Sequence, residues 1–305
     1  MSSVILETID LPNGETLGYR KRPGKEEVLL LLHGNMTSSA HWDLFLEAFA
    51  PDYTIYAVDL RGFGLSSYRR PIEGLSDFAG DVKALVDALS LPACSLVGWS
   101  MGGGVAMQYA ADHPESVQRL VLLASLSTRG YPYYRPDPKE AGGVGMARLK
   151  SRQEIARLPK MQLVQDAYAR RDKAFLRQLW DEMVYTCQKP TEKRYAAYLE
   201  DMLTQRNLLD VYDAMNRFNI SREDHAVAKG SGAVGRITMP TLVIWGRQDR
   251  VISEQMTQEL LTDIGNHAKW VVLDDCGHSP LVDALPEVLQ SIAAFLSSDD
   301  AGKRL

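Results

Sequence analysis

Hydrophobic residues occur along this chain as short continuous runs, separated by stretches with helical spacing. A run of about four to eight mainly apolar residues is typical of a strand that is buried on both faces, as in a parallel sheet covered by helices. Such runs are found at residues 28–32, 53–58, 93–97, 119–124, 241–246 and 270–273. Helical stretches are expected at residues 42–49, 75–89 and 287–295. Strand and helix therefore alternate, which predicts an α/β fold with a mostly parallel sheet.

The N-terminal segment adds two strands of another kind. Residues 4–8 and 16–20 flank the turn residues Pro12, Asn13 and Gly14, a pattern typical of an antiparallel hairpin at a sheet edge. With the buried runs, the predicted sheet has eight strands and is flanked by helices.

The alternation stops between residues 127 and 236. No buried strand is expected there, and the pattern instead predicts amphipathic helices at residues 173–186, 194–204 and 208–218. Eight of the 13 tyrosines fall in this stretch. We therefore divide the chain into a first core part (1–126), a helical insertion (127–236) and a second core part (237–305) that ends in a frayed tail from residue 297.

Composition and charge narrow the class of protein. The chain has 305 residues, is 45% hydrophobic and 24% charged, and carries a net charge of −5, so nucleic acid is not expected as a partner. The first residues lack the pattern of a secretory signal, and no apolar run is long enough to cross a bilayer. We expect a soluble, cytoplasmic protein without a transmembrane segment.

Cysteine usage gives no sign of a metal or disulfide framework. Cys94, Cys187 and Cys276 are odd in number and show no CxxC spacing. We expect neither a metal nor an organic cofactor.

The strongest chemical signal is the sequence Gly98-Trp99-Ser100-Met101-Gly102. It joins a predicted strand to a small-residue helix start, so Ser100 lies at a sharp corner whose neighbours must lack bulk. Such a corner raises the hydroxyl above the sheet and next to a helix N-terminus, where developing negative charge is stabilised. Ser100 is the predicted nucleophile.

A serine nucleophile needs a histidine base, which in turn needs a carboxylate. Asp249 and His278 each follow a predicted strand, and the chain order serine, acid, histidine fits this kind of corner. Asp274 and Asp275 are rival acids, but they share one loop with His278 and are less able to face it. Cys276 is a rival nucleophile without a comparable setting.

Five other histidines are rivals for the role of base, namely His33, His41, His113, His225 and His267. All but His33 are interpreted as surface or helix-end residues. His33 follows a strand and is interpreted mainly as packing its own loop, with substrate contact as the alternative. Trp99 is a further candidate for substrate contact.

The tetrahedral intermediate of acyl transfer needs two N–H donors. Met101 is expected to supply one from its backbone and Asn35, in the loop after the strand at 28–32, the other. The alternative for Asn35 is that its side chain touches the ligand.

Taken together, these motifs resemble the α/β-hydrolase fold family across nearly the whole chain. They are the His33-Gly34 loop, residues 59–66, 98–103 and 245–249, and Gly277-His278. The resemblance implies that the insertion is a helical cap. The loop at 33–39 is similar to the oxyanion loop of haloalkane dehalogenases, although Met36 stands where those usually have proline, and Ser100 argues against their aspartate nucleophile.

Within the family, the chain most resembles Bacillus-type intracellular poly(3-hydroxybutyrate) depolymerases, which are similar to 3-oxoadipate enol-lactonases. The residues that carry this are the Gly-Trp-Ser-Met-Gly box, its spacing to Asp249 and His278, the cap length and Arg129-Gly130-Tyr131-Pro132. The resemblance implies an acyl-enzyme on Ser100, release of 3-hydroxybutyrate, and polyhydroxybutyrate granules as a partner surface. Aromatic residues of the cap are candidates for binding the polyester, namely Tyr131, Tyr133, Tyr134 and Trp180.

Two other functions remain open from the residues alone. One keeps the triad on a smaller substrate, as a small-molecule esterase, enol-lactonase or C–C bond hydrolase. The other is a non-catalytic ligand receptor or granule-coating protein on the same fold.

Overall fold

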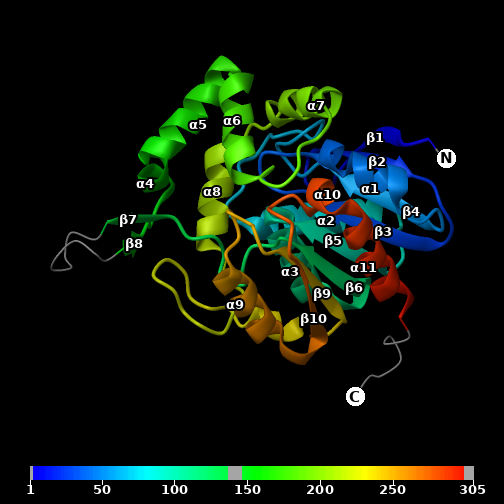
Figure 1. Cartoon of the computed structure of the whole chain (residues 1–305). Helices are drawn as coiled ribbons and strands as arrows, with labels where there is room; N and C mark the ends of the chain where they lie inside the picture. Colours follow the sequence, from blue (N-terminus) through cyan, green and yellow to red (C-terminus); the bar gives the residue numbers. More distant parts are fainter. Residues whose placement is uncertain (1–2, 137–145, 299–305) are drawn as a thin grey trace.

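An eight-stranded sheet forms the centre of the computed structural model, which describes residues 3–136 and 146–298 (Figure 1). The strand order is β1-β2-β4-β3-β5-β6-β9-β10, and only the β1–β2 and β2–β4 pairs are antiparallel. The strands are β1 (Ile5–Asp10), β2 (Thr16–Arg22), β3 (Glu27–Leu32), β4 (Tyr53–Val58), β5 (Cys94–Trp99), β6 (Val117–Leu123), β9 (Thr241–Gly246) and β10 (Ala268–Leu273). The predicted eight-stranded, mostly parallel sheet with an N-terminal hairpin is confirmed.

Both faces of the sheet are covered, and strand β3 shows why its apolar run is continuous. Leu30 and Leu32 pack into one core with helices α2, α3 and α9, whereas Leu29 and Leu31 pack into the other core with α1 and α11. Alternate side chains of a strand point to opposite faces, so a strand between two cores must be apolar at every position. The helices of the two layers are α1 (Asp43–Ala48), α2 (Leu75–Ala88), α3 (Met101–Asp112), α9 (Glu254–Ile264), α10 (Pro280–Asp283) and α11 (Leu285–Ser297).

The stretch between β6 and β9 supplies a separate group of helices, drawn at the upper left of Figure 1. Its elements are β7 (Tyr134–Pro136), β8 (Met146–Arg148), α4 (Arg152–Ala156), α5 (Pro159–Arg170), α6 (Lys173–Met183), α7 (Glu192–Met202) and α8 (Leu208–Arg217). Helix α6 is shorter than expected because the N–H of Tyr185 turns back to the carbonyl of Trp180. Helices α4, α5 and α9 were not predicted, and residues 299–305 of the expected tail lie outside the described residues.

Hydrogen bonds hold the two ends of this helical stretch together. The N–H of Ile220 donates to the carbonyl of Thr128 at 2.9 Å, and the N–H of Tyr131 donates to the carbonyl of Met215 at 2.9 Å. The chain therefore leaves the sheet layers and returns to them at one place.

His41 lies in the last turn of the short helical segment Ser39–Trp42, as the helix-end interpretation predicts, but it is not at the surface, because only 4% of it is exposed. Its Nδ1 lies 3.2 Å from a carboxylate oxygen of Asp201 on α7, and its ring stacks on Tyr198 at 4.2 Å between centroids. These contacts join the short helical turn Ser39–Trp42 to α7. Across the described ranges, no helix combines the length and apolar character needed to cross a membrane.

Candidate active site

Ser100 sits at the corner between β5 and α3 with φ 56° and ψ −119°, a conformation that few residues other than glycine adopt. A Cβ atom at Gly98 would overlap the carbonyl oxygen of Gly102, and one at Gly102 would overlap the carbonyl oxygen of Leu32. The corner can therefore form only with glycine at these positions. It presents the hydroxyl at the start of α3, beside the end of β3.

His278 and Asp249 meet this serine in a continuous chain of hydrogen bonds. The His278 Nε2 lies 3.0 Å from the Ser100 Oγ, and its Nδ1 lies 2.9 Å from the Asp249 Oδ2. Because a carboxylate only accepts, Nδ1 carries the ring proton and Nε2 is left to accept from the serine. The second carboxylate oxygen of Asp249 accepts the N–H groups of Val251 and Ile252 at 2.7 and 2.8 Å, which fixes the carboxylate plane.

The rival residues occupy other places. Asp274 is exposed and pairs with Arg247 at 2.7 Å, and Asp275 accepts from the side chain of Gln248. Neither contacts His278. Cys276 is fully buried, and that burial raises the pKa of its thiol far above the ordinary value, so it is not suited to act as a thiolate.

Two side chains hold the loop that carries His278. The indole N–H of Trp99 donates to the His278 carbonyl at 2.9 Å, and Asp283 accepts the N–H of Gly277 at 2.8 Å. Trp99 is only 2% exposed and lies against the base of the cavity described below. The Trp99 Nε1 atom thus holds the loop that carries His278, and the apolar part of the ring is left to contact a substrate.

The loop after β3 passes close to the nucleophile. A Cβ atom at Gly34 would lie 3.2 Å from the Ser100 Cβ, so glycine permits this approach. Within residues 3–136 and 146–298, the backbone N–H groups of Asn35 and Met101 have no hydrogen-bond acceptor. The Asn35 side-chain oxygen accepts from Gln205 at 2.8 Å. Met36 has φ 61°, which proline cannot adopt, so this loop differs in its backbone from one with proline there.

His33 does not line the cavity, so the alternative of substrate contact is wrong, whereas the main interpretation, packing of its own loop, agrees with the structure. It is fully buried beneath the loop, its Nδ1 donates to the Gly34 carbonyl at 2.7 Å, and its Nε2 accepts the Leu60 N–H at 3.0 Å. Burial lowers the pKa of His33 to about 4, so the ring is neutral. The strand end directs its side chain under the loop, where it stabilises the Gly34 peptide.

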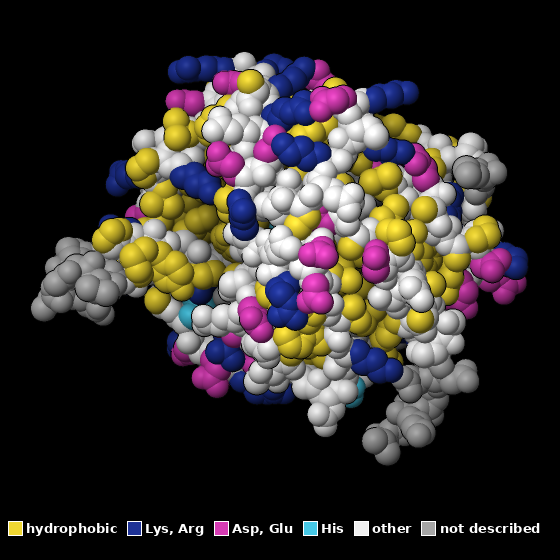
Figure 2. Space-filling view, viewed as in Figure 1, with side chains coloured by type: hydrophobic (Ala, Val, Ile, Leu, Met, Phe, Trp, Pro, Cys, Tyr) yellow, Lys and Arg dark blue, Asp and Glu magenta, His cyan; other side chains and the backbone are white. Residues whose placement is uncertain are grey.

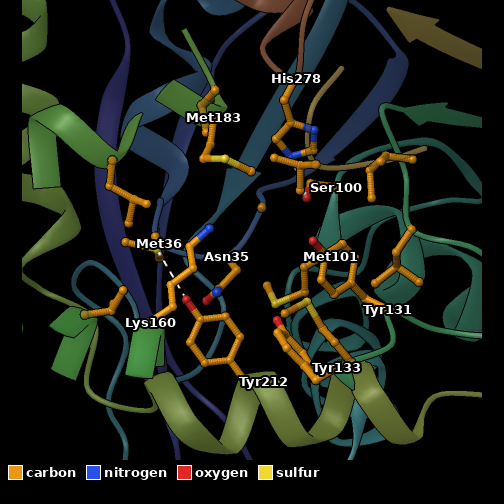
Figure 3. Close-up of a pocket in the computed structure, with 18 of the residues that line it drawn as sticks. Asn35, Met36, Ser100, Met101, Tyr131, Tyr133, Lys160, Met183, Tyr212 and His278 are labelled. Carbon is orange, nitrogen blue, oxygen red and sulfur yellow. Dashed lines mark hydrogen bonds between the residues drawn. The ribbon is translucent and has the colours of Figure 1, made fainter. Parts of the chain in front are cut away.

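A cavity of about 330 Å³ opens next to Ser100 and His278 (Figure 3). Its walls are largely apolar and come mostly from the helical stretch, and they include the candidates Tyr131, Tyr133, Tyr134 and Trp180. Tyr134 is 46% exposed and belongs to the rim, on a face where hydrophobic side chains gather beside β7 and β8 (Figure 2). The tyrosine-rich composition of this stretch pointed to these residues.

Other wall residues were missed from the sequence, among them Met36, Lys160, Met183 and Tyr212. The Tyr212 hydroxyl lies 3.6 Å from the Met36 sulfur, which brings α8 against the loop after β3. The predicted amphipathic helix at 208–218 was the available signal for Tyr212, but the pattern does not tell a helix face that lines a cavity from one that packs in a core. In the described parts of the chain, no cluster of three or more His, Cys, Asp or Glu side chains could hold a metal ion.

Residues 27–285 match the family model described as alpha/beta hydrolase fold. The chain belongs to this family. One alpha/beta hydrolase relative is a 2-hydroxy-6-oxononadienedioate/2-hydroxy-6-oxononatrienedioate hydrolase from a Pseudomonas species, 28% identical over 95% of this chain and 95% of that protein. Another is a pimeloyl-acyl-carrier-protein methyl ester esterase from a Shewanella species, 29% identical over 90% of this chain and 92% of that protein.

Solved structures agree with the alpha/beta hydrolase fold. An esterase from Exiguobacterium antarcticum superposes with a TM-score of 0.73, covering 98% of this chain and all of that one, at 18% identity. The relatives are C–C bond hydrolases and esterases, so hydrolysis is supported, whereas the finer resemblance to poly(3-hydroxybutyrate) depolymerases is not supported by them.

Proposed function

We propose that this alpha/beta hydrolase is a serine hydrolase that cleaves small carboxylic esters. The observation that carries the proposal is the hydrogen-bonded chain from Ser100 through His278 to Asp249, with distances of 3.0 and 2.9 Å, at the wall of an apolar cavity. A hydrogen-bonded chain of this kind matches the roles of nucleophile, base and orienting acid.

The chemistry follows from these contacts. Ser100 attacks the ester carbonyl carbon while His278 takes its proton, and the oxyanion is stabilised by the backbone N–H groups of Asn35 and Met101. His278 then protonates the leaving alcohol. Water attacks the acyl-enzyme with His278 as the base again, which releases the acid and restores Ser100.

An ester is favoured as the substrate because of the cavity's walls. They consist mainly of Met, Leu, Val and aromatic side chains, which suit an alkyl or acyl group. The Shewanella relative is also an ester esterase by name. The volume of about 330 Å³ suits a small molecule. Cleavage of poly(3-hydroxybutyrate), association with its granules and a cytoplasmic location stay predictions.

C–C bond hydrolysis is the second candidate. It is supported by the Pseudomonas relative, which covers 95% of this chain. A dienedioate substrate has two carboxylates, so its binding calls for cationic groups, and Lys160 is a cation on the cavity wall.

The experiment compares three substrate classes with the purified protein: p-nitrophenyl esters of short acids, a 2-hydroxy-6-oxo-dienedioate, and amorphous poly(3-hydroxybutyrate) granules. We expect ester hydrolysis that Ser100→Ala lowers by about 10⁴-fold or more, because the covalent route is lost. Ser76→Ala, at an exposed serine of α2, is the control and should keep full activity.

The outcomes separate the candidates. Cleavage of the dienedioate in preference to every ester would assign C–C bond hydrolysis to this protein. Release of 3-hydroxybutyrate from the granules would assign poly(3-hydroxybutyrate) as its substrate. A protein that hydrolyses none of them, and whose Ser100 is not labelled by a fluorophosphonate, would instead be a non-catalytic receptor.

A further inference from the structure

Lys160 differs in chemistry from everything around it. Among the described residues that line the cavity, it is the only Lys, Arg, Asp or Glu, and His278 belongs to the catalytic chain. The remaining wall is apolar or carries neutral polar groups. Figure 3 shows the Lys160 side chain reaching into the cavity between Met36 and Tyr212, with its nitrogen pointing inward near Asn35.

The positive charge of Lys160 is not matched by an acidic side chain. No Asp or Glu among the described residues forms an ion pair with its ammonium group, whereas Lys173 pairs with Glu200 and Lys189 pairs with Asp181 at 2.7 Å. Lys160 is itself exposed, so it stands at the rim, where an entering molecule can meet it. A cation beside an apolar wall gains more from an anionic partner than it would in open water.

Helix stability gives no reason for a lysine at this position. Lys160 is the second residue of α5, and the first turn of that helix contains no acidic residue. The N-terminus of a helix carries partial positive charge, so a lysine there costs a few tenths of a kcal/mol or more. The charge is unfavourable for the helix and directed toward the cavity, which favours a role in binding.

We propose that Lys160 binds a carboxylate on the substrate, so that the preferred esters are half-esters of dicarboxylic acids. The proposal rests on the proposed ester hydrolysis and names the class of its substrate. The scissile carbonyl lies at Ser100 while the apolar wall holds the methylene chain. The carboxylate at the chain's other end accepts hydrogen bonds from the ammonium group.

The test compares p-nitrophenyl half-esters of glutarate, adipate and pimelate with neutral p-nitrophenyl esters of matching chain length. We expect the wild type to have a higher kcat/KM for the half-ester of one chain length. Lys160→Met should lower kcat/KM for that half-ester by about 10-fold or more, mainly through KM, and leave the neutral ester within about two-fold.

Further variants separate charge from packing. Lys160→Arg should keep most of the preference because it keeps the charge, and Lys160→Glu should lower half-ester turnover further than Lys160→Met because it adds repulsion. Lys150→Met is the matched control, since Lys150 is exposed and does not line the cavity. An equal loss on both ester classes, or no change with Lys160→Met, would overturn the proposal.

A binding measurement keeps this test separate from the proposed function. In the Ser100→Ala variant, calorimetry should show monomethyl adipate binding at least about 10-fold more tightly than dimethyl adipate, and Lys160→Met should remove the difference. If the wild type hydrolyses no ester, the proposed function fails. The calorimetric comparison still decides whether Lys160 binds a carboxylate.

Discussion

Replacing Asp249 with asparagine gives the sharpest test of how His278 is oriented. One oxygen of Asp249 accepts the N–H groups of Val251 and Ile252, at 2.7 and 2.8 Å. In Asp249→Asn the side-chain oxygen must stay on these two donors, because an amide nitrogen cannot accept. The amide NH₂ group therefore faces the His278 Nδ1.

This reversal acts on the tautomer of the ring. Nδ1 must accept from the amide, so the ring proton moves to Nε2, which lies 3.0 Å from the Ser100 Oγ. Nε2 then cannot take the serine proton. Restoring the productive tautomer leaves two N–H groups facing each other, which costs about 1–3 kcal/mol, and the charged hydrogen bond to the imidazolium, worth about 1.5–3 kcal/mol, is lost as well.

The combined loss of about 4 kcal/mol corresponds to a fall in kcat of about 10³-fold. It is measured as initial rates on the best p-nitrophenyl ester, with circular dichroism and thermal melting to show that the fold is intact. Asp274→Asn and Asp275→Asn are matched controls on the neighbouring loop and should stay within about two-fold. A loss below tenfold in Asp249→Asn, or a loss near 10³-fold in either control, would refute this account of the site.

Two further predictions concern stability. Gly98→Ala should lower the unfolding free energy by about 1–3 kcal/mol, because the added Cβ overlaps the Gly102 carbonyl oxygen. Gly80→Ala, on an open part of α2, should raise the unfolding free energy by about 0.5–1 kcal/mol. Urea denaturation measures both variants, and an unchanged stability of Gly98→Ala would contradict the corner geometry. The folded pKa of His33, about 4, lies below the ordinary value of 6.5, so the unfolded chain binds the proton first as pH falls. Unfolding free energy should therefore drop by up to about 3 kcal/mol between pH 6.5 and 4, and His33→Gln should lack this component of the pH dependence when the two proteins are compared by denaturation at each pH.

The sequence predicted the arrangement of Ser100, Asp249 and His278 because all three follow parallel strands. The carboxyl ends of such strands share one edge, so position along the chain is enough to bring these side chains together. The same reasoning left two interpretations of His33 open, because a strand end shows that a residue is near the edge but not whether its side chain lies above or beneath the loop. The structure agrees with the main interpretation, packing beneath the loop.

Residues on the helices were harder to predict for a different reason. An amphipathic pattern shows which face of a helix is apolar, but not whether that face covers a core or a cavity, and so Tyr212 was not assigned to the cavity. The burial of His41 was not predicted, because its partner, Asp201, is 160 positions away in the sequence and the local pattern gives no sign of the contact. Lys160 is an ordinary helix residue in sequence and becomes unusual only beside an apolar wall.

The origin of the cavity walls has a consequence for how this protein can change. The reacting groups come from loops at the strand ends, while most wall residues come from one continuous stretch whose ends are joined by the Thr128–Ile220 and Tyr131–Met215 hydrogen bonds. That stretch also supports the site, because Gln205 donates to the Asn35 side chain at 2.8 Å and the N–H of Gln188 donates to Asp283 at 2.8 Å. A change of substrate that leaves the chemistry intact must therefore keep these two contacts and alter the other wall residues of the stretch.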